Sequence, residues 1–206
     1  MTKPLPSHAR VVIVGGGVIG ASIAYHLTKF GWSDIVLLER KRLTSGTTWH
    51  AAGLVGQLRA TANLTKLAQY TTQLYATLEA ETGQATGFIQ RGSVSIATNP
   101  ARMEELLRGA SMAKNFGLEV NRVTPAEVKK FWPLLNVDDV VGGVHLPGDG
   151  QTNPIDTTMA LIKGATMRGG QVFENTLIDS ILTKDGRAIG VSTADGDILA
   201  EHVVIA

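Results

Sequence analysis

One stretch decides the fold: Val11-Val12-Ile13-Val14-Gly15-Gly16-Gly17-Val18-Ile19-Gly20. Four apolar residues without polar alternation are typical of a strand that is buried on both faces of a parallel sheet. Gly15, Gly17 and Gly20 fit the spacing G-x-G-x-x-G. In that pattern the first glycine permits a tight turn, the second lets backbone approach a pyrophosphate, and the third lets a helix pack closely on the strands. The phosphates would lie at the helix N-terminus, where free N–H groups favour negative charge.

A helix and a second buried strand are predicted after the glycines. The residues expected to bury one helix face are Ile19, Ile23, Leu27 and Phe30, before a stop at Gly31. The strand Ile35-Val36-Leu37-Leu38 leads into Glu39, which lies where an acid accepts hydrogen bonds from an adenosine ribose. That carboxylate would repel a 2′-phosphate, so NADP is disfavoured despite Arg40, Lys41 and Arg42. The pattern indicates dinucleotide binding, but it does not separate NAD from FAD.

The segment after Glu39 favours FAD. It combines hydroxyls, glycines and small residues that can lie against a flat ligand, in the order Ser45-Gly46-Thr47-Thr48-Trp49-His50-Ala51-Ala52-Gly53. With Glu39, this run resembles the sarcosine and dimethylglycine dehydrogenase family, which belongs to the D-amino-acid oxidase superfamily of flavin enzymes. The resemblance implies that His50 carries the flavin covalently through its 8α-methyl group. The alternative is that His50 is an ordinary hydrogen-bonded loop residue.

The motif and the resemblance together give a set of cofactor-binding residues. They are Gly15, Gly17, Val18, Ile19, Gly20, Glu39, Arg40, Ser45, Gly46, Thr47, Thr48, His50, Ala52, Gly53, Leu54 and Leu177. Leu177 enters through the family only, as a backbone contact to adenine. The other histidines share no spacing that suggests a metal site, and no metal is expected. No catalytic acid or base is assigned, because the resemblance implies that the substrate-contacting groups largely lie beyond Ala206. Arg59 and Arg91 are available cations for a substrate carboxylate, but surface salt bridges are the default expectation for both.

The resemblance implies an α/β fold, with a Rossmann-like FAD-binding domain of the GR2 or D-amino-acid oxidase type. An α+β substrate domain is inserted in it, and both are expected to be incomplete. The predicted boundaries are 1–86 for the first part of the FAD-binding domain, 87–147 for the substrate domain, and 148–206 for the continued FAD-binding domain. The chain ends in the apolar run Val203-Val204-Ile205-Ala206, typical of a buried parallel strand, so we expect an N-terminal fragment of a longer enzyme.

Periodicity places further elements along the chain. Helices are predicted at 63–82, at 100–116, from Thr124 to before Pro133, and at 154–169. Strands are predicted at 92–98, at 140–146, after the segment that begins at Gly170, and at 178–183, 188–193, 197–199 and 203–206. In the first helix Leu64, Leu67, Leu74 and Leu78 would be buried, with Glu79 and Glu81 in solvent. Pro147-Gly148-Asp149-Gly150 predicts a turn, and Asp185-Gly186 and Asp195-Gly196 predict hairpins.

Composition sets outer limits. The 206 residues carry a formal net charge of +1 with 18% charged and 44% hydrophobic residues, which gives no argument for nucleic acid or an anionic membrane as partner. Zero cysteines exclude disulfides, thiolate metal sites and cysteinyl flavin. Residues 1–10 lack an apolar signal core, and no apolar run reaches the ~20 residues of a bilayer span. We expect a soluble protein of the cytoplasm, or of the mitochondrial matrix if eukaryotic.

Three functional hypotheses follow. The first is FAD-dependent oxidative N-demethylation of an N-methyl amino acid such as sarcosine or dimethylglycine, with electrons passing to an electron-transfer flavoprotein or oxygen. Within the resembled family a missing C-terminal module would bind tetrahydrofolate. The second is a glycine or D-amino-acid oxidase with loosely held FAD. The third is a truncated nucleotide-binding module without activity of its own.

Overall fold

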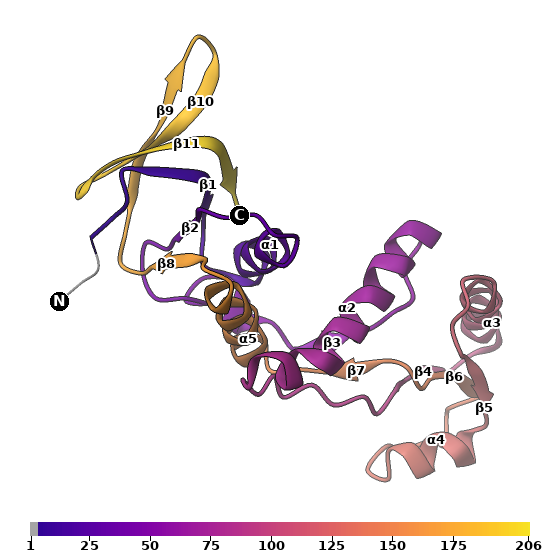
Figure 1. The fold of residues 1–206 in the computed structure, drawn as a ribbon. Coiled ribbons are helices and arrows are strands. Elements are labelled where there is room, and N and C mark those ends of the chain that lie inside the picture. The colour runs from indigo at the N-terminus through magenta and orange to yellow at the C-terminus, as the bar shows by residue number, and fades with distance from the viewer. Residues whose placement is uncertain (1–3) are drawn as a thin grey trace. The chain divides into compact units, whose positions relative to one another are not determined.

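The computed structural model describes residues 4–206, and the chain forms two compact units (Figure 1). The first unit comprises the described residues up to Ala52 together with Thr77–Gly87 and Asn153–Ala206, and the second comprises Gly53–Ala76 and Phe88–Thr152. Residues 53–76 and 148–152 therefore fall in the second unit, whereas the sequence prediction gave them to the FAD-binding domain. The two units are defined by how closely their backbones lie, which does not show which unit binds a cofactor. The boundaries of the FAD-binding and substrate domains therefore stay a prediction. Residues 1–3, part of the stretch predicted to lack a secretory signal, lie outside the described residues.

A six-stranded sheet forms the centre of the first unit, in the order β8-β2-β1-β11-β10-β9. Its strands are β1 (His8–Val14), β2 (Ile35–Leu38), β8 (Gln171–Phe173), β9 (Ile178–Lys184), β10 (Arg187–Thr193) and β11 (Gly196–Ile205). β1 pairs in parallel with β2 and β11, and β2 pairs in parallel with β8, while β10 runs antiparallel to both β9 and β11. All four residues of β2 are buried, as expected for a strand covered on both faces. The predicted α/β class is confirmed.

β11 corrects one prediction. Two separate strands were expected at 197–199 and 203–206, but a single strand runs from Gly196 to Ile205. Its first residues pair with β10 and the rest pair with β1, with Leu199 opposite both Gly190 and His8. The strand therefore closes the β9-β10-β11 meander and then joins the parallel sheet. The predicted Asp185-Gly186 hairpin is present, with φ of 51° and 74° at the two residues, as a type I′ turn requires.

Helix α1 (Val18–Lys29) buries a different face from the one predicted. Its buried residues are Gly20, Ala21, Ala24, Tyr25 and Thr28. Ile19 and Phe30, which were expected in the core, are 63% and 75% exposed. Mostly small side chains are buried in α1 because this helix lies close to helix α5 (Pro154–Met167), as Figure 1 shows. The helices are so close that a Cβ on Gly164 of α5 would come within 2.7 Å of the Tyr25 ring.

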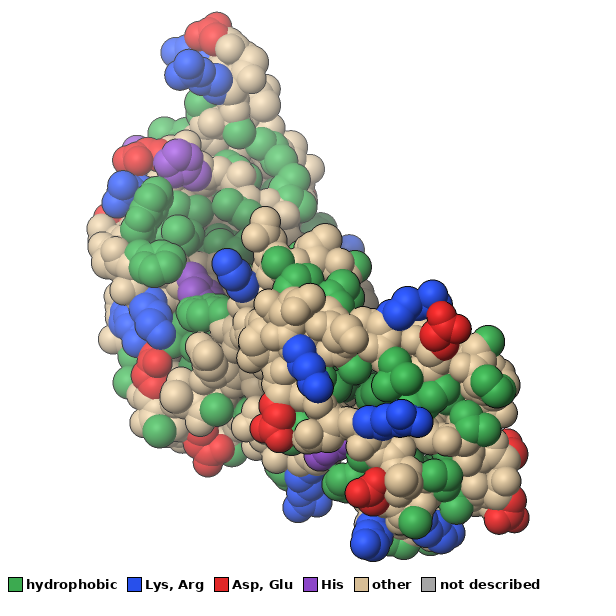
Figure 2. All heavy atoms as spheres, turned by 90° about the vertical axis from the view of Figure 1, so that its right-hand side faces the viewer, with side chains coloured by type: hydrophobic (Ala, Val, Ile, Leu, Met, Phe, Trp, Pro, Cys, Tyr) green, Lys and Arg blue, Asp and Glu red, His purple; other side chains and the backbone are tan. Residues whose placement is uncertain are grey.

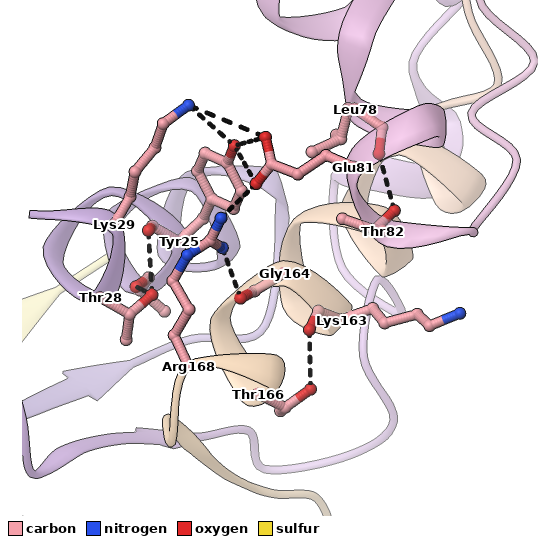
Figure 3. A network of polar contacts seen from close by, with 11 residues as sticks. Tyr25, Thr28, Lys29, Leu78, Glu81, Thr82, Lys163, Gly164, Thr166 and Arg168 are labelled. Carbon is pink, nitrogen blue, oxygen red and sulfur yellow. Dashed lines mark hydrogen bonds and ion pairs between the residues drawn. The ribbon is translucent and has the colours of Figure 1, made fainter. Parts of the chain in front are cut away.

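A polar network joins α1 and α5 to the last turn of helix α2 (Ala62–Thr82) (Figure 3). The Tyr25 hydroxyl lies 2.8 Å from both Glu81 carboxylate oxygens, the Lys29 ammonium lies 3.8 Å from Oε2, and the Arg168 guanidinium donates to Oε1. Arg168 also donates to the Gly164 carbonyl at 2.7 Å. Glu81 was predicted to lie in solvent, but its side chain is only 27% exposed. Burial raises the pKa of the Glu81 carboxyl, yet the hydrogen bonds and charges of these partners outweigh burial and lower that pKa below its usual value.

The first turns of α2 also depart from the predicted stripe. Leu64 and Leu67 are 51% and 62% exposed, whereas Thr65 and Thr72 are buried. The Thr72 hydroxyl donates to the Ala68 carbonyl at 3.0 Å, so it is buried without losing a hydrogen bond. Threonines can therefore occupy a core-facing stripe that a search for leucines overlooks. Farther along the helix, the predicted burial of Leu74 and Leu78 is confirmed.

The second unit contains an antiparallel sheet of β4 (Ser93–Ala97), β6 (Gly142–Leu146) and β5 (Asn121–Val123), in that order. Its remaining elements are β3 (Leu54–Val55), β7 (Gly150–Gln151), α3 (Pro100–Asn115), α4 (Pro125–Phe131) and residues 62–76 of α2. β3 and β7 form a separate antiparallel pair. The predicted helix that begins after Thr124 is present as α4, and it begins with a capping box: Glu127 Oε2 accepts from the Thr124 amide at 2.7 Å, and the Glu127 amide donates to the Thr124 hydroxyl at 3.3 Å.

The buried carboxylate of Asp149 joins three segments of the second unit. Its Oδ1 accepts from the Gln57 amide at 2.8 Å, and its Oδ2 accepts from the Ser93 hydroxyl at 2.6 Å. Its carbonyl accepts from the Gly92 amide at 2.8 Å, and its own amide donates to the Leu146 carbonyl at 3.2 Å. The predicted turn is therefore present, and its acid fixes the segments before β4 and after β3.

Candidate cofactor-binding site

The glycine turn after β1 has the steric requirements that the motif predicts. Gly15 adopts a φ of 115°, and a Cβ there would lie 2.2 Å from the Ala206 carbonyl oxygen. A Cβ on Gly20 would lie 2.0 Å from the carbonyl oxygen of Gly15. Contacts this short do not occur between real atoms, so both positions require glycine while the backbone stays where it is. The absence of side chains at Gly15 and Gly20 thus allows the start of α1 to pack directly against the end of β1.

The N-terminus of α1 opens beside this turn. The N-cap residue is Gly17, which has no side chain to accept from the first-turn amides. The Val18 amide donates to the Thr48 hydroxyl at 3.0 Å. Within residues 4–206 the amides of Ile19 and Gly20 carry no hydrogen bond. Free amides at a helix N-terminus form a site for a phosphate or another anion.

Glu39 lies against the same turn. Its Oε2 accepts from the Gly16 amide at 2.7 Å, and its Oε1 accepts from the Lys41 amide at 2.8 Å. The carboxylate at the end of β2 is therefore next to the predicted pyrophosphate position, as the sequence spacing indicates. An ionised carboxylate has about four lone-pair directions, and two remain for hydroxyl donors such as those of a ribose.

The loop from Leu43 to His50 is held to the glycine turn at two points. The Thr44 amide donates to the Gly16 carbonyl at 3.0 Å, and Thr48 accepts from Val18 as described above. Thr44 is buried and has a φ of 67°, a conformation that β-branched residues rarely adopt. Such strain is retained only where surrounding contacts fix the backbone, and it is common at ligand-binding sites. Between these two anchors the predicted cofactor residues Ser45, Gly46 and Thr47 are exposed.

His50 ends this loop, in the short 3-10 helix η1 (Thr48–His50). Its Nδ1 lies 3.1 Å from the Gly46 carbonyl oxygen, and its ring centroid lies 4.1 Å from that of Trp49 at an angle of 41°. Both side chains are exposed, Trp49 to 54%. The imidazole is therefore oriented by neighbouring groups yet open to a ligand.

A second segment, from Glu174 to Leu177, holds the backbone beyond Glu39. The Thr176 amide donates to the Glu39 carbonyl at 2.8 Å, and the Glu174 carboxylate accepts from the Leu43 amide at 2.6 Å. Sequence reasoning missed Glu174 and Thr176, because nothing local signals a contact across 131 positions. Leu177 follows directly and is 58% exposed, so a backbone contact to a ligand is sterically open there.

Some predicted residues take no part in this cluster. Arg40 and Ala52 are exposed, and Gly53 and Leu54 belong to the second unit, where Leu54 is 79% exposed. The surface salt bridges expected for Arg59 and Arg91 are absent from the described residues. The Arg59 guanidinium instead donates to the Leu58 carbonyl at 2.9 Å.

Acidic and basic side chains are interspersed on the face shown in Figure 2. From residue 4 onward, no group of three His, Cys, Asp or Glu side chains could hold a metal ion. Over the same residues, none of the helices combines the length and apolar character that crossing a membrane requires.

Comparison with known proteins decides the family. Residues 10–206 match the profile of the DAO family, described as FAD dependent oxidoreductase. The chain belongs to this family. Human mitochondrial sarcosine dehydrogenase is 45% identical to this DAO-family chain over 98% of the chain and 23% of that protein. Mouse mitochondrial pyruvate dehydrogenase phosphatase regulatory subunit is 40% identical over 97% of the chain and 23% of that protein.

Solved structures show the same fold. L-proline dehydrogenase from P. horikoshii superposes with a TM-score of 0.92 at 26% identity, covering 98% of the DAO-family chain and 53% of that structure. The chain therefore spans about a quarter of the length of these two mitochondrial relatives and about half of the solved structure. The residues present fit the family's cofactor, because free helix amides, an acid beside the glycine turn and an open loop are placed as an extended dinucleotide needs.

Proposed function

We propose that this chain is the FAD-binding part of an enzyme that oxidatively demethylates an N-methylated glycine, such as sarcosine or dimethylglycine, and that His50 holds the flavin covalently. The observation that carries the proposal is the convergence of Glu39 and the His50 loop on one glycine turn. Gly16 donates to Glu39 through its amide and accepts from Thr44 through its carbonyl. The first unit, with its Rossmann-like sheet, is then the FAD-binding domain, and the second contributes to the substrate domain.

FAD, when bound, supplies a hydride acceptor for the carbon next to the amine nitrogen. The amides of Ile19 and Gly20 would receive its phosphates, and Glu39 would receive the ribose hydroxyls on the lone pairs that Gly16 and Lys41 leave free. This arrangement disfavours a 2′-phosphate, which would meet the Glu39 carboxylate.

The hydrogen bond of His50 supports attachment through one particular nitrogen. A backbone carbonyl only accepts, so Nδ1 must carry the proton that it donates to Gly46. In the neutral ring the lone pair is then on Nε2. We assign Nε2 as the nitrogen that bonds the 8α carbon of the flavin.

The deciding experiment uses the protein expressed from its full reading frame. Its flavin absorbance is measured before and after acid precipitation, next to His50→Ala and, as matched control, His26→Ala. His26 is also partly exposed and also contacts a backbone carbonyl, that of Ser22 at 2.7 Å. Acid-stable colour should disappear in His50→Ala and persist in His26→Ala. Acid-stable colour in His50→Ala would remove the covalent assignment, and colour released from the wild type would favour an oxidase with loosely held FAD.

A second candidate is supported by the regulatory-subunit relative, which is nearly as similar as the dehydrogenase. In that role the chain would bind FAD or a related nucleotide without turnover. Reduction of the bound flavin under anaerobic conditions separates the two: bleaching by sarcosine or dimethylglycine supports the enzyme, and an unchanged spectrum with both supports the regulatory role.

The wider reaction extends beyond these residues. We propose that electrons leave to an electron-transfer flavoprotein or to oxygen, and that a further module captures the one-carbon unit on tetrahydrofolate. Reoxidation of the substrate-reduced protein by air within one turnover would identify oxygen as acceptor. Slow reoxidation in air would favour the electron-transfer partner. Fractionation of the source cells would test the predicted cytoplasmic or mitochondrial location.

A further inference from the structure

Two groups hold the imidazole of His50. The Gly46 carbonyl lies 3.1 Å from Nδ1, and the Trp49 ring lies against the imidazole at a centroid distance of 4.1 Å. Within residues 4–206 the Trp49 side chain makes no other ring contact and no hydrogen bond. The hydrogen bond fixes which nitrogen carries the proton, and the indole limits rotation of the ring about its bond to Cβ.

The loop itself gives these two contacts a fixed base. Thr48, which precedes Trp49, is buried and accepts from the Val18 amide at the start of α1. The His50 amide donates to the Thr47 carbonyl at 3.2 Å, which closes the turn of η1. The backbone of η1 is thus tied to the helix that would bind the phosphates, and only the side-chain torsions of His50 remain to be set.

An indole that is 54% exposed contributes less to burial than a core tryptophan does. Within the described residues its one ring contact is with the His50 imidazole, so we take that contact as the one through which it acts. Aromatic pairs contribute about 0.5–1.5 kcal/mol beyond the area that they bury, which corresponds to roughly two- to tenfold in a rate when the contact favours the reactive geometry.

We propose that Trp49 is a positioning residue for flavin attachment, which holds the His50 imidazole with Nε2 directed at the flavin while Gly46 fixes the proton on Nδ1. This inference rests on the proposed covalent role of His50. In the step that it assists, an Nε2–C bond forms and one C–H bond of the 8α-methyl group breaks. Once the Nε2–C bond has formed, the Nδ1 proton leaves the imidazole, and a second proton leaves the methyl group. The two electrons pass to a two-electron acceptor such as dioxygen, which takes up both protons to give hydrogen peroxide.

The test follows attachment directly. Full-length protein is prepared without riboflavin, mixed with saturating FAD in air, and sampled over time for flavin fluorescence that survives acid and denaturing gel electrophoresis. We expect Trp49→Ala and Trp49→Leu to attach flavin about two- to tenfold more slowly, and Trp49→Phe to restore most of the rate. Leucine keeps apolar bulk beside His50 without a ring, so it removes stacking with less loss of volume than alanine and gives a second variant if the alanine variant folds poorly.

Non-covalent affinity is the second readout. FAD dissociation constants are compared for His50→Ala and for His50→Ala combined with Trp49→Leu, and we expect them to agree within about twofold. Wild-type attachment rates in both Trp49→Ala and Trp49→Leu would overturn the inference. A matching loss of FAD affinity in the double variant would also overturn it, because Trp49 would then bind the cofactor rather than position His50. Acid-stable flavin in His50→Ala would instead show that the proposed covalent role has failed.

Discussion

The Glu39 carboxylate accepts a hydrogen bond from the Gly16 amide at 2.7 Å, across 23 positions of sequence. This contact places the acid at the end of β2 against the turn that ends β1. It also means that Glu39 has a structural role before any ligand arrives, since it satisfies the amides of Gly16 and Lys41. Substitutions at Glu39 should therefore affect both cofactor affinity and the local backbone.

Replacing Glu39 with glutamine should weaken FAD binding by about ten- to a hundredfold, since charge-assisted hydrogen bonds contribute about 1.5–3 kcal/mol. The amide oxygen can still accept from one backbone N–H, but the NH₂ group faces the other. FAD dissociation constants measured in a His50→Ala background would show the change. Glu201→Gln, an exposed acid of the same unit paired with Arg10 at 3.7 Å, should bind as its parent does. Unchanged affinity in Glu39→Gln would contradict a ribose contact.

Gly20→Ala should abolish FAD retention and destabilise α1, because its Cβ would lie 2.0 Å from the Gly15 carbonyl oxygen. Overpacking of this kind typically costs about 1–3 kcal/mol. Gly109→Ala is the matched control: Gly109 lies within α3 and has no atom within 4 Å of an added Cβ. It should stabilise that helix by about 0.5–1 kcal/mol. Thermal unfolding and bound flavin per chain check both, and normal flavin content in Gly20→Ala would show that the turn is not tight.

The sequence predicted those parts of the site in which one residue type has one physical use. Three features depend on local chemistry alone: glycines that leave room for a neighbouring backbone, a continuous apolar strand, and an acid at the end of a strand. The structure brings the corresponding residues Gly15, Gly20 and Glu39 together. Thr44 could not be found in this way. Its φ of 67° is imposed by contacts of the folded loop, and threonine gives no sign of it in a sequence.

Helix faces were the least predictable part of the fold. The α1 stripe was placed on Ile19 and Phe30 because large apolar residues were assumed to face the core. Close helix packing selected Ala24 and Tyr25 instead. Glu81 was misjudged for a related reason, since its partners Lys29 and Arg168 lie 52 and 87 positions away, and no local pattern reveals them.

Glu81→Gln should weaken the junction of α1, α2 and α5 by about 1–3 kcal/mol at neutral pH. The pKa of Glu81 is lower in the folded state than its usual value of 4.5. The stabilisation from its charge is therefore complete above pH 4.5 and is lost as the pH falls through the folded-state pKa. Amide hydrogen exchange of α1 and α5 should show a difference between wild type and variant that is largest at pH 7 and shrinks in acid.

Glu79→Gln is the control for that profile, because Glu79 is exposed on the same helix and forms no ion pair within the described residues. Its exchange rates should follow the wild type at every pH. A Glu81→Gln difference that stays constant from pH 7 to pH 3 would show that the ionised carboxylate is not the source of the stabilisation.

Asp149→Ala should destabilise the second unit by about 1–3 kcal/mol, because it leaves the Gln57 amide and the Ser93 hydroxyl without their acceptor. Asp149→Asn should recover part of the loss, since one amide oxygen can still accept from Gln57 or Ser93. The exposed Asp138 offers the comparison, and Asp138→Ala should change stability by no more than about 0.5 kcal/mol. Hydrogen exchange of the amides of β4 and β6 reports the loss locally. Equal protection in the Asp149→Ala and Asp138→Ala variants would mean that the segments around residues 57, 93 and 149 are held by packing alone.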